Sequence, residues 1–174
     1  MKRVYIGAML LFLTSTGYTQ PQVTIIDTSF SYVYMEFQGL LYQIPQNIRI
    51  LMQEAQKQDI MAHILSSIFV IQFYSNLQVE PSDDVWGLGF RVPDDMAVNP
   101  PLKKAVYEYE KVARTIYVGP YETASQAYNT MIPFIDEENM EIIGPPIQMY
   151  LDDPSQVAPE SCRTEILIPV KKLE

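Results

Sequence analysis

The stretch SCRTEILIP, residues 161–169, decides the fold, because the chain carries a counterpart of it in VWGLGFRVP, residues 85–93. Both stretches are rich in β-branched and bulky apolar residues and end in proline, which is typical of a β-strand that stops at a turn. They match position for position, so that Pro169 corresponds to Pro93. This correspondence predicts an internal duplication.

The segments before these two strands extend the duplication. Each half is predicted to contain a strand that ends at glycine, a helix with apolar residues three and four positions apart, and a further apolar strand. These elements occupy 31–39, 44–55 and 67–75 in the first half, and 111–119, 124–135 and 145–154 in the second. Pro133 is expected to kink or shorten the second helix, because proline lacks the N–H group that a helix interior needs.

We therefore expect an α+β domain built from a duplicated β-α-β-β unit. Two such units predict a sheet of antiparallel strands with both helices packed on one side. Pseudo-two-fold symmetry would place a central cleft where the halves meet, a common position for a ligand pocket. The first half spans about 30–93 and the second about 110–170, and the segment 94–109, with its polar, proline-containing start, is expected to link them.

The first twenty residues, MKRVYIGAMLLFLTSTGYTQ, have the pattern of a secretory signal peptide. Lys2 and Arg3 form a basic start, and the apolar stretch 4–13 is shorter than the roughly 20 residues that a membrane span needs. Cleavage before Gln20 would remove 1–19 and leave 20–174 as one exported domain, in the periplasm or outside the cell, with no membrane segment. The alternative is an uncleaved N-terminal anchor.

The composition argues against a nucleic-acid partner. The net charge is −9, and it becomes −11 when the leader removes two basic residues and no acidic one. Such a surface repels a phosphate backbone. The chain has a single cysteine, Cys162, a single histidine, His63, and no glycine-rich phosphate loop. We therefore predict no internal disulfide, no metal site and no cofactor.

Tyrosines and one glutamate are the candidate functional residues. The tyrosines that follow the leader are Tyr32, Tyr34, Tyr42, Tyr74, Tyr107, Tyr109, Tyr117, Tyr121, Tyr128 and Tyr150. A tyrosine has a large apolar face and a polar tip, which suits both packing in a sheet and binding of a flat organic molecule. Glu165 lies in the last strand, and its counterpart in the first half is Gly89. The carboxylate therefore belongs to one half only, as a single asymmetric site would require.

The environment of Glu165 decides its role. Alternation along the strand places it on the same face as Leu167. That face is either exposed to solvent or turned into a cavity, and the asymmetry of the repeat favours the cavity. A carboxylate buried among aromatic rings takes up a proton or attracts a cation. Arg163, two residues earlier on the same face, is the rival that could pair with Glu165 and neutralise it.

Three stretches of the second half resemble the GyrI-like small-molecule-binding domain, the effector-binding module of AraC- and MerR-type multidrug regulators that also occurs alone. They are IYVGPYETASQAYNTMIPFI (116–135), IIGPPIQMYLDDP (142–154) and RTEILIPV (163–170). The order of these motifs matches over residues 110–170, and the first half resembles the family only through the repeat. The resemblance implies the duplicated fold with an aromatic cleft between its halves.

The resemblance also implies site residues. In the regulators a glutamate on the last strand lies at the pocket floor and pairs with cationic, lipophilic compounds, and here that position is Glu165. Tyr150 falls at the tyrosine before the Asp-Pro turn. The expected ligand-binding set is Glu165, Tyr150, Tyr117, Tyr121, Trp86 and Tyr34. The DNA-binding partner domain of the regulators is absent, so transcriptional control is not implied, and an export signal argues against a role directed at gyrase.

Three functions remain open. The first is binding of small hydrophobic organic molecules, cationic ones among them, without catalysis, as in multidrug binding. The second follows from relatives that hydrolyse strained electrophiles: Glu165 would activate water together with Tyr150 or Tyr117. The third is an exported structural or interaction protein without a ligand, because a fold alone does not determine function. The ligand and the oligomeric state stay open.

Overall fold

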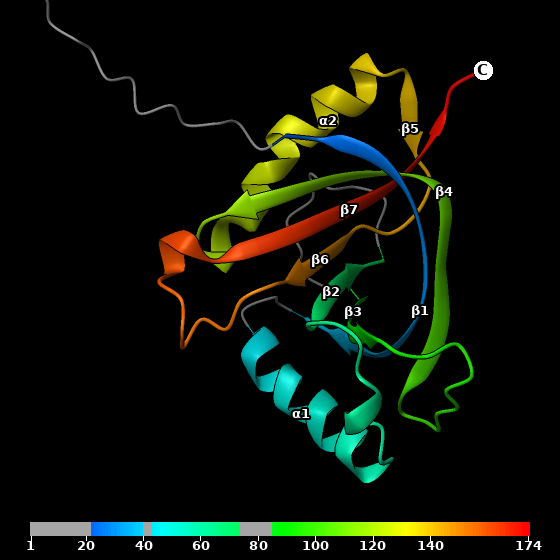
Figure 1. The fold of residues 1–174 in the computed structure, drawn as a ribbon, viewed down its shortest axis with the longest axis vertical. Coiled ribbons are helices and arrows are strands. Elements are labelled where there is room, and N and C mark those ends of the chain that lie inside the picture. Colours follow the sequence, from blue (N-terminus) through cyan, green and yellow to red (C-terminus); the bar gives the residue numbers. More distant parts are fainter. Residues whose placement is uncertain (1–21, 40–42, 74–84) are drawn as a thin grey trace, which may run out of the picture.

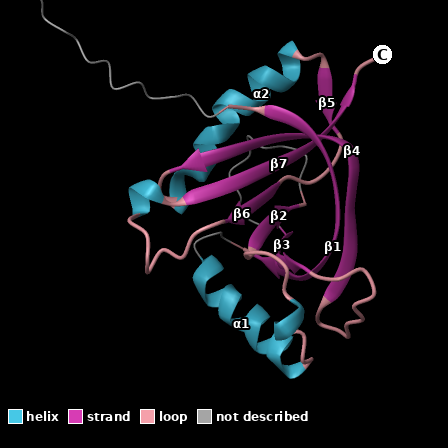
Figure 2. Ribbon diagram, viewed as in Figure 1, coloured by secondary structure: helices cyan, strands magenta, loops and turns pink. Residues whose placement is uncertain are grey.

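The structure of this chain is a computed structural model, and it describes residues 22–39, 43–73 and 85–174. Figures 1 and 2 show the arrangement of its helices and strands. The elements are β1 (Thr24–Gln38), α1 (Ile44–Lys57), η2 (Met61–His63), β2 (Phe69–Gln72), β3 (Val85–Arg91), β4 (Lys103–Val118), η3 (Tyr121–Ala127), α2 (Tyr128–Glu137), β5 (Met140–Ile142), β6 (Ile147–Tyr150), η4 (Pro159–Ser161) and β7 (Arg163–Lys172). The predicted signal peptide, Tyr42 and Tyr74 lie outside the described residues.

The predicted order of strands and helices is confirmed, with differences in length. β4 already begins at Lys103, so only the first part of the segment expected to link the halves is a loop. The second predicted helix starts with the 3-10 turns of η3, and α2 proper begins at Tyr128 and continues through Pro133. The short strand β5 was not predicted, because its few residues carry too weak an alternation to be recognised in the sequence.

The strands form one antiparallel sheet that closes on itself. Its order is β4-β1-β3-β2-β6-β7-β5, and an additional pairing joins β4 to β7. Every ladder between the described strands is antiparallel. Closure turns the sheet into a barrel-like ring, so it has an inner and an outer face. An antiparallel α+β fold with two helices is thus confirmed, whereas the duplication and its two-fold symmetry stay predictions.

A β-bulge in β4 changes which of its side chains face inward. Ile26 of β1 is opposite Val112, but Thr28 is opposite Tyr109, so β4 has one extra residue between these two pairs. An extra residue reverses the alternation of side chains beyond it. As a result Tyr107 and Tyr109, before the bulge, lie on the same side of the sheet as Arg114 after it.

The two helices pack on the same side of the sheet, which we call the helix face. Leu51 and Ala55 of α1 contact the side chains of β1 and β3 that point to this side. Met131 and Ile135 of α2 contact the corresponding side chains of β4 and β7, such as Ile166. Burial of these apolar stripes holds the helices in place. Within the described ranges no helix is long and apolar enough to span a membrane.

Candidate functional site

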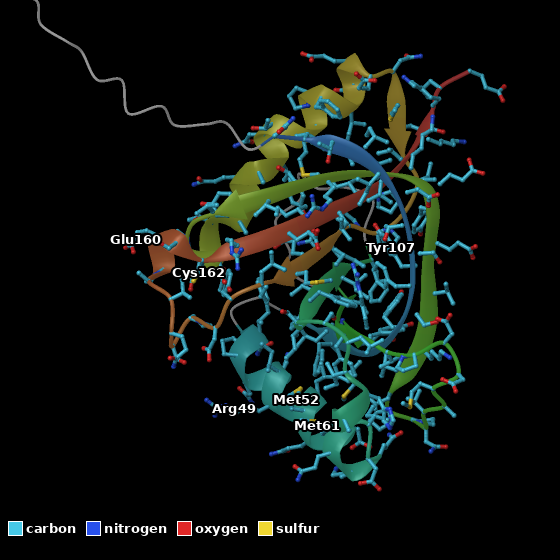
Figure 3. The ribbon with its side chains drawn as sticks, in the orientation of Figure 1. Arg49, Met52, Met61, Tyr107, Glu160 and Cys162 are labelled. Atoms are coloured by element: carbon cyan, nitrogen blue, oxygen red, sulfur yellow. The ribbon has the colours of Figure 1, made fainter. Side chains whose placement is uncertain are left out.

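The inner side of the sheet, opposite the helices, carries a cluster of aromatic side chains that we call the aromatic face. It consists of Phe30, Tyr32, Tyr34, Phe69, Phe73, Tyr107 and Tyr109. Phe30 is stacked on Tyr107 with their ring centroids 5.0 Å apart. Figure 3 shows Tyr107 on the inner side of the long strands β1 and β4. Strand alternation gathers these rings, because residues two apart in β1 and in β4 point to the same side.

Two glycines of β3 leave space for the rings. A Cβ atom at Gly89 would lie 2.6 Å from the carbonyl oxygen of Val33 and 3.1 Å from the ring of Phe69. At Gly87 it would lie 3.2 Å from the ring of Phe73 and 3.3 Å from that of Tyr34. The absence of side chains on this part of β3 therefore lets rings from its two neighbouring strands lie across it.

Glu165 lies on the aromatic face. In β7 it shares this side with Leu167, which belongs to the aromatic cluster, whereas Ile166 and Ile168 point to α2. The side chain of Glu165 is 15% exposed, so its carboxylate is largely withdrawn from water but still accessible. This is the orientation expected from the alternation of the last strand.

The partner of Glu165 is Arg114, which the sequence did not indicate. Arg114 Nε donates a hydrogen bond to Glu165 Oε1 over 2.6 Å. The predicted rival, Arg163, instead forms a bidentate ion pair with Asp152, from Nε to Oδ2 over 3.0 Å and from Nη2 to Oδ1 over 2.8 Å. The expectation that Arg163 could pair with Glu165 was therefore wrong, because Arg163 is exposed at the start of β7 and turns towards the Asp152 loop.

A second arginine, Arg91, lies against the ring cluster. Its guanidinium carbon is 3.8 Å from the centroid of the Phe30 ring, in a cation–π arrangement. The buried Nε atom of Arg91 and the buried hydroxyl of Tyr107 have no hydrogen-bond partner among the described residues. When residues 85–93 are aligned with 161–169, Arg91 corresponds to the apolar Leu167. The same alignment singled out Glu165 because its counterpart is Gly89, so it could also have singled out Arg91.

Burial changes the ionisation of the aromatic face. Desolvation, together with the neighbouring Tyr34 and Tyr109, raises the pKa of Tyr32 to about 12. Burial also raises the pKa values of Tyr107 and Tyr109. Desolvation lowers the pKa of Arg91, and the negative charge of Glu165 partly offsets this effect. These tyrosines are therefore neutral at physiological pH and offer hydroxyl groups rather than charges.

Four of the six residues expected to bind ligand lie on the helix face. Trp86 is buried in the cluster under α1, and its Nε1 donates a hydrogen bond to the carbonyl oxygen of Gly39 over 2.9 Å. Tyr117 packs against the α2 cluster, and its hydroxyl is hydrogen-bonded to Thr123 Oγ1 over 2.8 Å. Both side chains are thus engaged in packing away from Glu165.

Tyr150 and Tyr121 form a pair on the helix face. Their ring centroids are 4.6 Å apart, and the Tyr121 hydroxyl donates to the carbonyl oxygen of Asp152 over 2.5 Å. Burial, with Tyr128 and other neighbours, raises the pKa of Tyr150. In the ladder of β6 and β7, Met149 is opposite Glu165 and Tyr150 is opposite Thr164, so Tyr150 and Glu165 point to opposite sides of the sheet. The structure does not bring this pair together.

Of the six expected residues the structure therefore brings only Glu165 and Tyr34 to the same side. The arginines Arg91 and Arg114 and the ring of Phe30 were missed. Arg114 could not be found by alternation, because the bulge in β4 lies between it and the tyrosines of the same strand.

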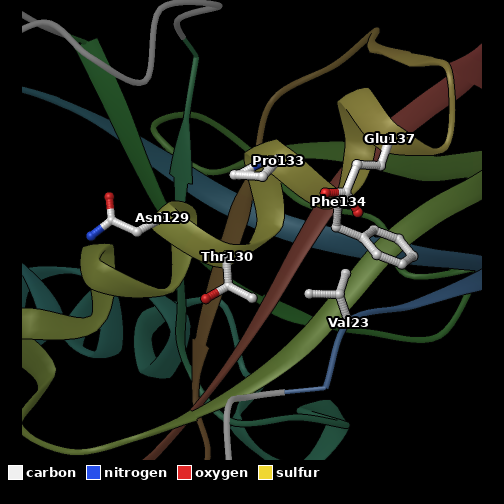
Figure 4. A pocket seen from close by; sticks show the side chains of 6 residues that line it. All are labelled: Val23, Asn129, Thr130, Pro133, Phe134 and Glu137. Atoms are coloured by element: carbon white, nitrogen blue, oxygen red, sulfur yellow. The ribbon is translucent and has the colours of Figure 1, made fainter.

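A shallow pocket lies elsewhere, between the outer surface of α2 and the start of β1 (Figure 4). Its volume is about 380 Å³, and it contains none of the predicted site residues. Its lining residues are Val23, Asn129, Thr130, Pro133, Phe134 and Glu137. In the described part of the chain no three side chains are grouped as metal ligands would be. His63 is exposed at the end of η2.

Comparison with known proteins defines the family. The sequence profile of the GyrI-like small molecule binding domain matches residues 22–171. Among curated proteins no sequence matches the chain significantly. Solved structures that share the fold include the C-terminal domain of EcmrR, with 16% identity and a TM-score of 0.73 over 88% of this chain and 99% of that one.

Two structures from Listeria innocua share the fold as well. One is an uncharacterized conserved protein, with 14% identity and a TM-score of 0.68 over 87% of this chain and 92% of that one. The other is a hydrolase encoded by lin2189, with 17% identity and a TM-score of 0.58 over the same shares, 87% and 92%. At these identities the likeness concerns the fold alone, whereas the family profile extends over nearly all described residues. The chain belongs to the GyrI-like small-molecule-binding domain family.

Proposed function

We propose that this protein binds small hydrophobic organic molecules on the aromatic face, with Glu165 as the acidic group beside the rings. The observation that carries the proposal is the placement of Glu165 and seven aromatic side chains on one side of the sheet, with the helices packed on the other. Rings provide a large apolar contact area, and a few polar groups among them orient a ligand. Membership of a small-molecule-binding family supports this function.

The charge of the ligand depends on the state of Glu165. A lone carboxylate among rings would recruit a lipophilic cation, which was the expectation from the sequence. Here Arg114 already holds the carboxylate over 2.6 Å. A cationic ligand must therefore compete with an arginine of the protein itself.

We also propose that residues 1–19 form an export signal and that the binding domain is a duplicated unit. The leader pattern supports the first proposal. For the second, the pairing of β1 with β3 and of β3 with β2 in the first half has a counterpart in the pairing of β4 with β7 and of β7 with β6 in the second.

Tyr34→Ala is expected to weaken binding of the neutral dye N-phenyl-1-naphthylamine by about 3- to 10-fold, because one ring contact of the aromatic face is removed. The matched control is Tyr121→Ala, which removes a partly buried ring on the opposite side of the sheet and should leave the affinity unchanged. Fluorescence titration measures both. If only Tyr121→Ala weakens dye binding, the binding site lies on the helix face instead. If the unmodified protein does not bind the dye, the proposed function is contradicted.

Arg114→Gln is expected to raise the affinity for the lipophilic cation rhodamine 6G by about 10-fold, because the carboxylate of Glu165 loses its partner and becomes available to the dye. Arg163→Gln also removes one positive charge, but it frees Asp152 rather than Glu165, so it should not change the affinity for rhodamine 6G. Fluorescence anisotropy with the two variants separates these cases. Equal affinities of Arg114→Gln and the unmodified protein would show that Glu165 is not a cation site.

A further inference from the structure

We propose that Arg91 and Tyr107 bind the carboxylate of an apolar organic acid whose hydrocarbon body lies on the aromatic face. This inference rests on the proposed binding function of that face and adds the chemical class of the ligand. It differs from the expectation of a cationic ligand, which considered Glu165 alone.

The first observation is that two buried hydrogen-bond donors lack acceptors. Arg91 Nε and the Tyr107 hydroxyl have no partner among the described residues. Both flank the ring of Phe30, which lies 3.8 Å from the guanidinium carbon of Arg91 and is stacked on Tyr107 at 5.0 Å. An unsatisfied buried donor destabilises the folded state, so such groups normally find a partner. Both donor atoms are covered in this structure, so a ligand that supplies acceptor oxygens would remove this cost after the neighbouring side chains move aside.

The second observation is the balance of charge around the rings. Arg114 and Glu165 neutralise each other in a salt bridge of 2.6 Å. At the far end of β1, Glu36 and Lys103 form another pair at 2.6 Å. Arg91 is left with a positive charge that no salt bridge of the described residues compensates, although it lies within electrostatic range of Glu165.

The environment of Arg91 favours an anion with an apolar body. A partly desolvated guanidinium gains more from a carboxylate than an exposed one, because less water screens the pair. Its planar array of N–H donors also matches the geometry of a carboxylate. The surrounding rings would contact only an apolar or aromatic body. These requirements together describe an aromatic or aliphatic carboxylic acid rather than an inorganic anion.

Three probes with the same ring system test this inference: 2-naphthoate, which is anionic, 2-naphthamide, which is neutral, and 2-naphthylmethylammonium, which is cationic. Isothermal titration of the full chain should show that 2-naphthoate binds at least about 10-fold more tightly than 2-naphthamide and that the ammonium binds most weakly. If none of the three binds, the proposed function of the aromatic face fails. If the amide binds as tightly as the carboxylate, or the ammonium binds best, binding stands and the inference about the ligand is overturned.

Arg91→Gln should lower the affinity for 2-naphthoate by about 10-fold or more and leave that for 2-naphthamide nearly unchanged. The matched control is Arg49→Gln, which makes the same change of charge on the exposed surface of α1 (Figure 3) and should affect neither probe. An equal effect of the two variants on 2-naphthoate would reduce the role of Arg91 to net charge and overturn the proposal.

Tyr107→Phe separates ligand binding from a structural role. Because the hydroxyl has no partner among the described residues, its removal should leave the melting temperature unchanged or raise it, while the affinity for 2-naphthoate falls by about 5- to 10-fold. A variant with lower stability and undiminished affinity would show that the hydroxyl serves the fold instead, and it would overturn the assignment of Tyr107.

Discussion

Trp86→Ala is expected to lower the free energy of unfolding by about 3–5 kcal/mol, the usual range for removing a large aromatic side chain from a core. Trp86 is 2% exposed and packs in the cluster that includes Leu51 and Ala55 of α1. Its ring lies 5.3 Å from that of Phe37, and its indole N–H donates to the carbonyl oxygen of Gly39. The substitution therefore removes packing and one hydrogen bond and leaves a cavity under α1.

Urea denaturation measures this loss, with the slope of the transition as a check that unfolding stays two-state. Trp86→Phe is the control: it keeps an aromatic ring and should cost roughly 1–2 kcal/mol, mainly because the carbonyl of Gly39 loses its donor. Probe binding by the folded fraction should not change in either variant, since Trp86 lies on the helix face. A folded Trp86→Ala variant with undiminished stability but lost probe binding would instead make Trp86 a ligand residue, as the family resemblance implied.

Gly89→Ala is expected to lower the free energy of unfolding by about 1–3 kcal/mol, through overpacking. The new Cβ atom would lie 2.6 Å from the carbonyl oxygen of Val33, a backbone atom of the neighbouring strand that cannot move without disturbing the ladder. It would also lie 3.0 Å from the Cβ of Tyr34. The substitution should therefore displace a ring of the aromatic face as well as destabilise the sheet, so the affinity for N-phenyl-1-naphthylamine should fall too.

Gly87→Ala is the matched control, because it adds the same methyl group on the same face of the same strand. Its nearest neighbours are side-chain ring atoms of Phe73 and Tyr34, at 3.2 and 3.3 Å, which can shift by a few tenths of an ångström. Alanine also loses less conformational freedom on folding than glycine does, which raises the free energy of unfolding by about 0.5–1 kcal/mol. We expect a change of less than about 1 kcal/mol for this variant. Equal losses for the two variants in denaturation would contradict the steric explanation for Gly89.

The sequence differences between the two predicted halves bear on the proposed binding of small molecules. Gly89 in β3 and Glu165 in β7 are counterparts in the aligned halves: one leaves space for rings from β1 and β2, and the other supplies a carboxylate beside them. Arg91 and Leu167 are the next such pair, with the charge in the first half and the apolar side chain in the second. The predicted repeat thus pairs an apolar or small residue with a charged one at both positions, and these two charged residues, Arg91 and Glu165, are opposite in sign.

Much of the fold could be predicted from the sequence because it depends on local patterns. Alternation in the last strand sends Ile166 and Ile168 to the helices and leaves Glu165 on the other side, as the structure has it. The three- and four-residue spacing of apolar residues predicted both helices. The side of the last strand on which Glu165 lies, the order of the strands along the chain and the family itself could be deduced from such patterns, since each involves residues close in sequence or motifs in a defined order.

Only the tertiary structure decided which residues surround Glu165. Arg114 reaches it because β4 pairs with β7, and because the bulge turns Arg114 to the same side as Tyr107. Tyr150 points away from it because the register of β6 and β7 places Met149, not Tyr150, opposite the glutamate. An ion pair between residues 51 positions apart depends on strand pairing and register. Strand pairing and register are set by packing of the whole sheet and leave no periodic pattern along the chain. The neutralisation of Glu165 by Arg114 could therefore not be predicted from the sequence.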